Sequence, residues 1–228
     1  MSLTTGRADT MPVRHLVWDM DGTLLDSGVA VPVSFVAAVR RLGGPQLRPE
    51  DVAASYARGP SDVLLAHLLG RDLAAGESEV YYEELSGATV LPYPGVLDVL
   101  DVLAALRAGG QPVAVFTGAS HRAASMLLAG AGIRTDVLVG GDEIERPKPA
   151  GDGLLLAAHR LGVAAADLAY IGDAPNDLRA ASAVRAVSAA AGWGHQYDSS
   201  APADITLAAP RDALPLLADG IAGTGEAG

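Results

Sequence analysis

The stretch W-D-M-D-G-T-L, residues Trp18–Leu24, carries two aspartates separated by one residue and followed at once by Gly-Thr. In an extended strand alternate side chains share a face, so Asp19 and Asp21 start out aimed at the same point. Two such charges are costly together unless a divalent cation separates them, or unless one carboxyl is a nucleophile and the other a proton donor. The alternative is a strand that ends in an ordinary Asp-Gly turn.

The composition is that of an acidic chain with a large apolar fraction. Of its 228 residues 50% are hydrophobic, which is enough for a sizeable core, and the formal net charge is -11. Because that charge repels phosphate backbones and anionic lipids, we expect no nucleic-acid or membrane partner, and nothing indicates a protein partner. The chain has no cysteine, which excludes disulfides, thiolate metal sites and a cysteine nucleophile. Without an apolar signal or membrane-spanning stretch, the expected location is cytoplasmic.

Strand and helix patterns alternate over most of the chain. Short apolar runs predict strands at 13–18, 112–116, 136–139 and 168–171, with weaker signals at 185–188 and 204–207. Segments rich in alanine and leucine predict helices at 95–108, 121–131, 150–161 and 175–183. This alternation predicts an α/β fold with a doubly wound parallel sheet, in which ligands bind at the carboxyl ends of the strands.

Residues 27–91 interrupt the alternation. They carry helical patterns at 35–42, 49–57, 62–69 and 77–85 and no convincing strand, so we expect a helical insertion between the first strand and the rest. Its exit at 88–95 contains two prolines and is typical of a stiff hinge. The expected organisation is a core of 13–26 and 92–219, a helical cap of 27–91, and flexible ends at 1–12 and 220–228.

Polar groups follow two further predicted strands. Thr117 and Gly118 place a hydroxyl and an unhindered amide at the start of the next helix, which suits an anion, although Ser120 could make this an ordinary capped helix start. In G-D-A-P-N-D, residues 172–177, Asp173 at a strand end suits metal binding and Asp177 on the next helical turn can point back toward it. Helix capping by these acids is compatible with that role.

Lys148, held between two prolines, is the only lysine in the chain. A compact ammonium is preferred over a planar guanidinium where a point charge must contact both a carboxylate and a phosphoryl oxygen. If the four aspartates converge, two carboxylates 4 Å apart repel by about 4 kcal/mol at an effective dielectric of 20, which one lysine cannot offset. A Mg²⁺ ion held by oxygen ligands can, so we predict a magnesium cofactor.

These motifs together resemble the haloacid dehalogenase superfamily in its phosphatase branch. The resemblance rests on D-M-D-G-T-L, Lys148 and G-D-A-P-N-D, and later pieces such as A-G-W-G-H resemble its phosphoglycolate phosphatase group. It implies a Rossmann-like sheet in the order 5-4-1-2-3, a helical cap, and a small phosphorylated metabolite as the substrate.

The resemblance also implies roles for individual residues. Asp19 would be the nucleophile that forms an aspartyl-phosphate and Asp21 the general acid and base, while Thr117 and Lys148 would hold the phosphoryl oxygens. Magnesium would be bound by Asp19, the backbone carbonyl of Asp21, and Asp173, with Asp177 in or just behind this ligand set.

Three features depart from the family pattern or leave the substrate open. Where relatives often have asparagine after Thr117, this chain has Gly118, so a substrate contact would come from its amide. Arg58 of the cap could clamp a second anionic group or be an ordinary solvated arginine, and His121 and Arg122 could line the entrance or lie on a helix surface.

The reaction itself also has alternatives. The presence of Asp21 argues against a dehalogenase, and the lack of a cap lysine argues against a phosphonatase. A phosphatase for phosphoglycolate-like substrates is the expected function. A sugar-phosphate or pyrophosphate hydrolase, a phosphomutase, and an inactive protein that binds a phosphorylated ligand remain as alternatives.

Overall fold

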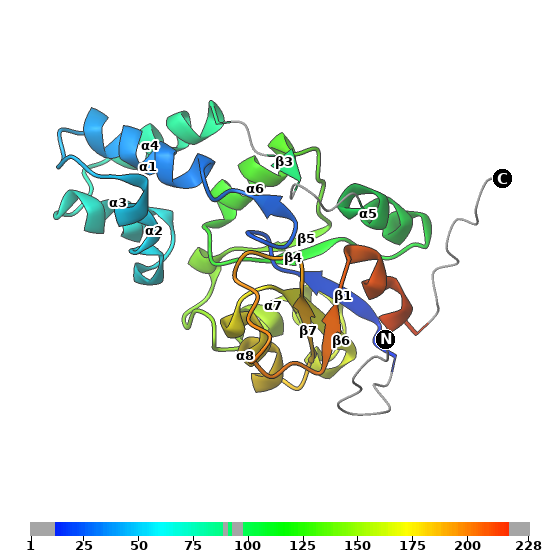
Figure 1. Ribbon diagram of the computed structural model, residues 1–228. Coiled ribbons are helices and arrows are strands. Elements are labelled where there is room, and N and C mark those ends of the chain that lie inside the picture. The colour runs from blue at the N-terminus through cyan, green and yellow to red at the C-terminus, as the bar shows by residue number, and fades with distance from the viewer. Residues whose placement is uncertain (1–11, 89–90, 93–97, 219–228) are drawn as a thin grey trace.

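The computed structural model describes residues 12–88, 91–92 and 98–218 (Figure 1). Apart from Pro12, the expected terminal extension at 1–12 lies outside the described residues, as do the expected tail at 220–228 and most of the expected hinge at 88–95. The centre of the molecule is a six-stranded parallel sheet in the order β5-β4-β1-β6-β7-β8. Its strands are β1 (His15–Trp18), β4 (Ala114–Phe116), β5 (Val137–Val139), β6 (Leu168–Gly172), β7 (Val187–Ala191) and β8 (Ile205–Leu207).

The strand order confirms an α/β Rossmann-like fold and adds one strand to it. Numbered along the chain, β1, β4, β5, β6 and β7 have the expected order 5-4-1-2-3, and β8 extends the sheet beyond β7. In the register of the central strand, Trp18 lies beside Val115 on one side and beside Ile171 on the other. The residues that follow these strands, among them Asp19, Thr117 and Asp173, therefore emerge at one edge of the sheet.

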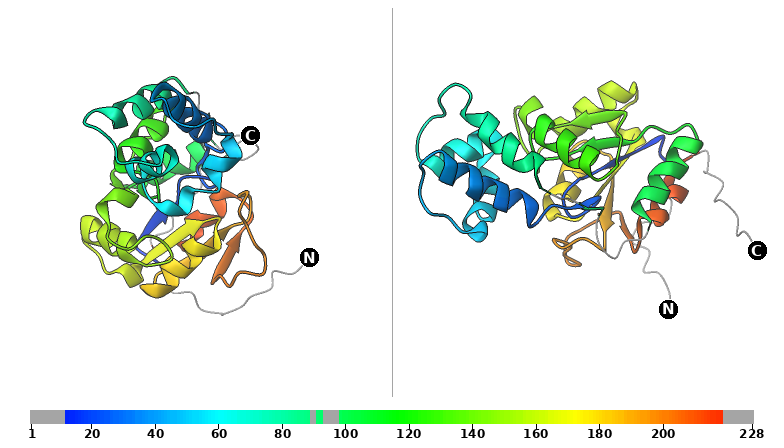
Figure 2. Two further views of the ribbon diagram at one scale, coloured as in Figure 1. Left: turned by 90° about the vertical axis from the view of Figure 1, so that its left-hand side faces the viewer. Right: turned by 90° about the horizontal axis from the view of Figure 1, so that it is seen from above.

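Helices cover both faces of the sheet (Figures 1 and 2). One face packs its apolar side chains against α7 and α8, and the other packs against α5, α6 and the turn η4. The bounds of the core helices and turns are α5 (Val99–Ala108), α6 (His121–Gly130), η2 (Gly141–Glu143), α7 (Asp152–Leu161), η3 (Ala165–Asp167), α8 (Pro175–Ala183) and η4 (Pro210–Leu216). None of the helices in the described part of the chain combines the length and the apolar character needed to cross a bilayer.

Strand β7 differs from its sequence prediction of 185–188. Arg185 has a φ of 62°, a left-handed conformation that ends the preceding turn and cannot belong to a strand. The strand instead runs through an alanine triplet to Ala191, and these alanines are almost completely buried. Alanine is a poor strand former, so it is the position between β6 and β8 that makes this segment extended.

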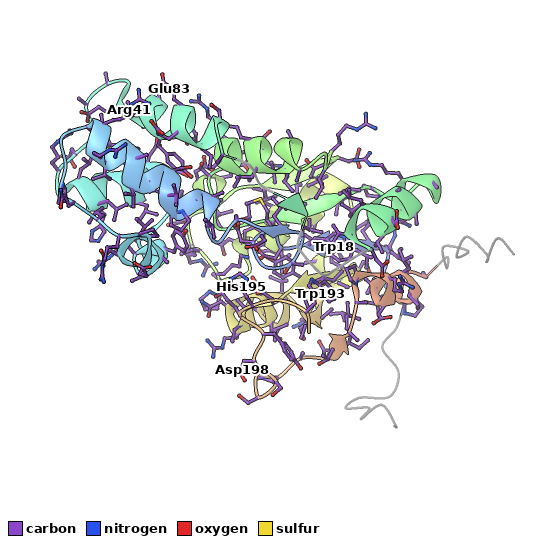
Figure 3. The ribbon with its side chains drawn as sticks, turned by 45° about the horizontal axis from the view of Figure 1, so that its top comes forward. Trp18, Arg41, Glu83, Trp193, His195 and Asp198 are labelled. Carbon is purple, nitrogen blue, oxygen red and sulfur yellow. The ribbon has the colours of Figure 1, made fainter. Side chains whose placement is uncertain are left out.

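Residues 27–88, which we call the helical insert, project from the sheet edge as a separate layer of helices (Figures 1 and 2). They form α1 (Ala30–Arg41), α2 (Pro49–Ala53), the turn η1 (Tyr56–Arg58), α3 (Ser61–Leu69) and α4 (Glu77–Ser86). Inside the insert, the Phe35 and Tyr81 rings stack with centroids 4.0 Å apart. At its outer edge Arg41 pairs with Glu83 at 2.8 Å (Figure 3).

The chain enters and leaves the insert through a short ladder that the sequence did not predict. Strand β2 (Leu25–Asp26) pairs antiparallel with β3 (Leu91–Pro92). Each strand has only two residues, too few for a periodic pattern. The start of α1 also differs from its prediction, since this helix begins at Ala30 rather than at 35. Pro32 lies in its first turn, where proline is tolerated.

Candidate active site

The D-M-D-G-T-L segment turns back on itself directly after β1. The amides of Leu24 and Leu25 both donate to the carbonyl of Met20, and the amide of Gly22 donates to that of Leu25. Gly22 has a φ of 81°, and a Cβ at this position would lie 2.4 Å from Oδ2 of Asp173. Glycine is therefore required here both by the backbone conformation and by the close approach of the carboxylate.

Three aspartates, one from D-M-D-G-T-L and two from G-D-A-P-N-D, come together at the edge of the sheet. One ligand atom of each of Asp19, Asp173 and Asp177 lies within 4.8 Å of the others, and all three side chains are buried. Burial raises the pKa of Asp19 well above its usual value, and the charge of Asp177 raises it further, while Lys148 opposes both effects. The cluster is therefore costly by itself and favours a bound cation.

Lys148 supplies part of the positive charge. Its Nζ donates to Oδ1 of Asp19 at 2.5 Å and to Oδ1 of Asp177 at 2.7 Å, and its side chain is 14% exposed. Although burial lowers the pKa of Lys148, the two carboxylates outweigh burial and raise that pKa above its ordinary value. The lysine is therefore charged at neutral pH and bridges two of the three acids.

The lysine and the acids rest on two aromatic rings. Nζ of Lys148 lies 5.0 Å from the centroid of the Phe116 ring and 5.4 Å from that of Tyr170. The Tyr170 hydroxyl donates to the carbonyl of Phe116 at 2.9 Å and lies 3.4 Å from Oδ1 of both Asp19 and Asp177. These rings lie against the ion pairs, and the carboxylates of Asp19 and Asp177 are buried.

Asp173 shows why a metal ion fits this site. Its Oδ2 accepts a hydrogen bond from the amide of Gln196 at 2.9 Å, but its Oδ1 is buried without a hydrogen-bond partner among the described residues. A buried, unpartnered carboxylate oxygen costs about 1–3 kcal/mol or more, which a coordinated cation would remove. Carboxylate oxygens are also the ligands that Mg²⁺ prefers, so the donor set fits this ion.

Asp21 lies beside the cluster of Asp19, Asp173 and Asp177 and is not part of it. Its Oδ1 accepts a hydrogen bond from the hydroxyl of Ser27, at the entrance to the helical insert. Burial raises the pKa of Asp21, and the hydrogen bond from Ser27 and the charge of Lys148 act in the opposite direction. A carboxyl with a raised pKa, hydrogen-bonded away from the other acids, is suited to carrying a proton.

Thr117 and Gly118 occupy the loop between β4 and α6. The buried Thr117 hydroxyl accepts from the amide of Ala119 at 3.2 Å, while Gly118 is exposed and a Cβ placed on it would meet no atom within 4 Å. Ser120 caps α6 by accepting from the amide of Ala123 at 3.3 Å. The capping alternative is thus present, and Ser120 rather than Thr117 supplies the cap.

A family model for haloacid dehalogenase-like hydrolases matches residues 13–185, a range that includes D-M-D-G-T-L, Thr117, Lys148 and G-D-A-P-N-D. The chain belongs to this family. A phosphoglycolate phosphatase of Xanthomonas campestris pv. campestris is 35% identical over 213 residues, which cover 86% of this chain and 93% of that protein. The phosphoglycolate phosphatase of Chromobacterium violaceum is 29% identical over 221 residues, covering 91% and 98%.

A solved structure shares the fold of this hydrolase. CbbY from Rhodobacter sphaeroides, in complex with phosphate, matches with a TM-score of 0.73 at 19% identity and covers 92% of this chain and 99% of its own. The family match and the relatives make this chain an enzyme, a haloacid dehalogenase-like hydrolase of the phosphatase branch.

The remaining candidate residues of this hydrolase, Arg58, His121 and Arg122, lie in the insert and in α6. Arg58 is exposed in η1, and its side chain forms no ion pair with any residue that the structure describes. Both terminal nitrogens of the Arg122 guanidinium donate to the Glu79 carboxylate of the insert, Nη2 at 2.7 Å. The guanidinium carbon lies 4.0 Å from the centroid of the Tyr82 ring. Nδ1 of His121 lies 2.9 Å from Oε2 of Glu143 on the surface of the core.

Several residues around the site were not singled out from the sequence. In the sequence, Tyr170 is distinguished only as part of an apolar strand, and Ser27 only as the first residue of the insertion. Trp193 and Gln196 lie in and next to A-G-W-G-H, a segment that resembled one group of relatives but carried no role. The available signal was the alternation in β6, which places Tyr170 on the same face as Gly172 and hence near the acids.

Proposed function

We propose that this hydrolase is a Mg²⁺-dependent phosphatase that cleaves a small phosphomonoester through an aspartyl-phosphate on Asp19. The observation that carries the proposal is the contact between the buried Asp19 carboxylate and Lys148, next to an Asp173 oxygen that lacks a partner among the described residues. This combines a nucleophile, a fixed positive charge and a place for a cation, which are the parts that phosphoryl transfer needs.

The residues proposed to hold magnesium are Asp19, Asp173 and the backbone carbonyl of Asp21. Asp177 would stand behind them, because Lys148 and the Ala174 amide already engage its two oxygens. When bound, the ion would neutralise negative charge on the phosphoryl group as it is transferred.

In the first half of the reaction, one oxygen of Asp19 attacks phosphorus and the bond from phosphorus to the leaving oxygen breaks. Lys148 and the Thr117 hydroxyl bind the equatorial phosphoryl oxygens and align the group with the attacking carboxylate. Asp21 donates its proton to the leaving oxygen, which departs as an alcohol. The raised pKa of Asp21 supports its role as the acid.

In the second half, the deprotonated Asp21 takes a proton from water as this water attacks the phosphorus of the aspartyl-phosphate. The bond between phosphorus and the Asp19 oxygen then breaks, which releases inorganic phosphate and regenerates the carboxylate. Asp21 thus acts as an acid and then as a base, while the Ser27 hydroxyl holds one of its oxygens in place.

Residues 27–91, which include the helical insert, are proposed to form a cap that closes over a core of residues 13–26 and 92–219. Ser61 and Tyr82 of the insert contact the Ser120 hydroxyl at 2.9 and 3.2 Å, two residues after Gly118. A closed cap would exclude water from the ion pairs and strengthen them.

A phosphoglycolate-like compound is the substrate class that we propose to test first, because relatives that cover nearly the whole chain carry that name. A second anionic group on the substrate needs its own cation. Arg122 is engaged by Glu79 and His121 by Glu143, so we propose Arg58 of the insert, which forms no ion pair with any described residue.

The decisive experiment is phosphate release from a panel of glycolate, sugar, nucleotide and pyrophosphate substrates, with Mg²⁺ and with a chelator. We expect turnover that requires the metal and that Asp19→Asn abolishes. In Asp21→Asn, mass spectrometry after acid quenching should detect a phosphorylated Asp19 peptide. No release from any substrate, or full activity of Asp19→Asn, would show that the proposal is wrong.

A further inference from the structure

Residues Gly192–Gln196, the segment after β7 that we call the tryptophan loop, pass directly over Asp173. The amide of Gln196 donates to Oδ2 of Asp173 at 2.9 Å. A Cβ on Gly194 would lie 2.1 Å from the Cβ of Asp173, so the loop backbone and the carboxylate side chain are in direct contact. Figure 3 marks Trp193 and His195 on this loop.

A side-chain hydrogen bond joins this loop to the D-M-D-G-T-L segment. Nε1 of Trp193 donates to the carbonyl of Thr23 at 3.0 Å, within the segment that begins at Asp19. The Trp193 ring is partly buried against the main hydrophobic core. The loop is also tied at its base, where the amide of Gly192 donates to the carbonyl of Leu207 at 2.9 Å.

These contacts determine which oxygen of Asp173 is free. A carboxylate can rotate about its terminal bond, so either oxygen could turn toward a cation. Since the Gln196 amide holds Oδ2, Oδ1 is left as the buried oxygen without a partner among the described residues. The position of the Gln196 amide in turn depends on where Trp193 anchors the loop.

We propose that Trp193 is a positioning residue that, through the tryptophan loop, orients Oδ1 of Asp173 for the metal ion. This inference rests on the magnesium site of the proposed function and adds a determinant of its affinity. Partners that orient a metal ligand without touching the metal commonly contribute about 10- to 100-fold in affinity.

The test is metal binding, measured by isothermal titration with Mg²⁺ and by loss of the free Mn²⁺ signal in electron paramagnetic resonance. Trp193→Phe keeps an aromatic ring but removes the N–H donor, and its dissociation constant for both ions should rise about 10-fold. Gly194→Ala, which pushes a Cβ into Asp173, should weaken binding at least as much.

Asp198→Asn is the matched control. Asp198 lies further along the same segment, where it accepts hydrogen bonds from the amide and hydroxyl of Ser200, and no described contact joins it to Asp173 (Figure 3). Asparagine keeps an acceptor for Ser200 but removes the charge, so this variant perturbs the segment without changing the Asp173 contacts, and its metal affinity should equal that of the wild type. The effect of Trp193→Phe should also vanish in an Asp173→Asn background, because the indole acts through that carboxylate.

The possible outcomes distinguish a failure of this inference from a failure of the proposed function. Wild-type metal affinity in a folded Trp193→Phe protein overturns the role of the loop and leaves the metal site standing. An equal loss of affinity in Asp198→Asn overturns it too, because the loss then comes from general loosening. If the wild type binds neither ion, or Asp173→Asn binds both as tightly as the wild type, the metal site itself is wrong and the inference falls with it.

Discussion

The ammonium of Lys148 donates to Oδ1 of Asp177 at 2.7 Å, while the other oxygen of Asp177 accepts from the amide of Ala174 at 3.0 Å. Both oxygens of Asp177 are thus engaged by protein groups. Asp173, in contrast, keeps one buried oxygen without a partner among the described residues. The two acids of G-D-A-P-N-D therefore differ, since Asp177 orients the lysine and Asp173 offers a ligand atom.

This difference predicts distinct effects of Asp177→Asn and Asp173→Asn. Asn at 177 keeps an acceptor for the Ala174 amide but removes the charge that holds Lys148, so kcat should fall about 100-fold. The Mg²⁺ affinity of Asp177→Asn should change by less than about 10-fold, whereas that of Asp173→Asn should fall by at least about 10-fold. Steady-state kinetics and titration calorimetry check both, and equal losses of metal affinity in the two variants would contradict the assignment.

Replacing Lys148 by methionine should abolish most of the activity. The change removes the cation that binds Asp19 and that is proposed to bind the phosphoryl group, so kcat should fall by about 100- to 1,000-fold. The metal-free protein should also lose about 3 kcal/mol of stability in urea, because two buried carboxylates remain unpaired. Arg146→Met is the control, since Arg146 lies two residues away and its side chain is 71% exposed in a pair with Asp152.

Arg58 provides a test of substrate class. If its guanidinium binds a second anionic group, Arg58→Ala should raise KM for phosphoglycolate by about 10- to 100-fold, as expected for a hydrogen bond between charged groups. KM for p-nitrophenyl phosphate, which has no second anion, should not change. Arg40→Ala alters another exposed arginine of the insert and should leave both values unchanged. Equal effects on the two substrates would exclude this role.

The contact between Ser61 and Ser120 links the insert to the core. Ser61→Ala removes that hydrogen bond and should lower the free energy of unfolding by about 1 kcal/mol, with a higher KM because the closed arrangement is less favoured. Ser86→Ala is the matched control, because the Ser86 hydroxyl donates to the carbonyl of Glu83 within its own helix and forms no hydrogen bond with the core residues that the structure describes. Urea denaturation and KM measurements compare the two, and indistinguishable variants would mean that the contact does not hold the cap.

Glu143, which lies away from the active site, should make the stability of the protein depend on pH. Although burial raises the pKa of Glu143, hydrogen bonds from Arg160, the Gly140 amide and His121 outweigh it and lower that pKa to about 2. The folded-state pKa lies below the ordinary value of 4.5, so the stabilisation is complete above pH 4.5 and is lost as the pH falls toward 2.

Glu143→Gln should therefore be less stable than the wild type at pH 7, by about 1 kcal/mol because the ion pair is partly exposed. The difference should shrink between pH 4.5 and pH 2. Glu145→Gln, at an exposed neighbouring position, should show no such trend. Urea denaturation at pH 7, 4 and 3 gives the comparison, and a difference that stays constant with pH would rule out the ionised Glu143 as its source.

Much of the fold could be predicted from local patterns. The alternation of apolar strands with helices indicated a parallel sheet, and the helix Pro175–Ala183 has the expected bounds because Pro175 marks its first turn. The extended alanines of β7 could not be predicted, because their intrinsic preference is helical and only burial between two strands overrides it. The two-residue strands β2 and β3 carry no periodic signal at all.

The amino-acid sequence alone identifies the chemical groups of the candidate site, namely Asp19 and Asp21, the only lysine, and the acids that follow β6. The acids stand at strand ends, and parallel strands bring their carboxyl ends to one edge. Tertiary structure alone decided which atoms meet. Lys148 contacts Asp19 across 129 positions of sequence, Tyr170 supports both, and Trp193 holds the loop over Asp173. Such contacts depend on strand register and on packing between distant segments, which no local pattern encodes.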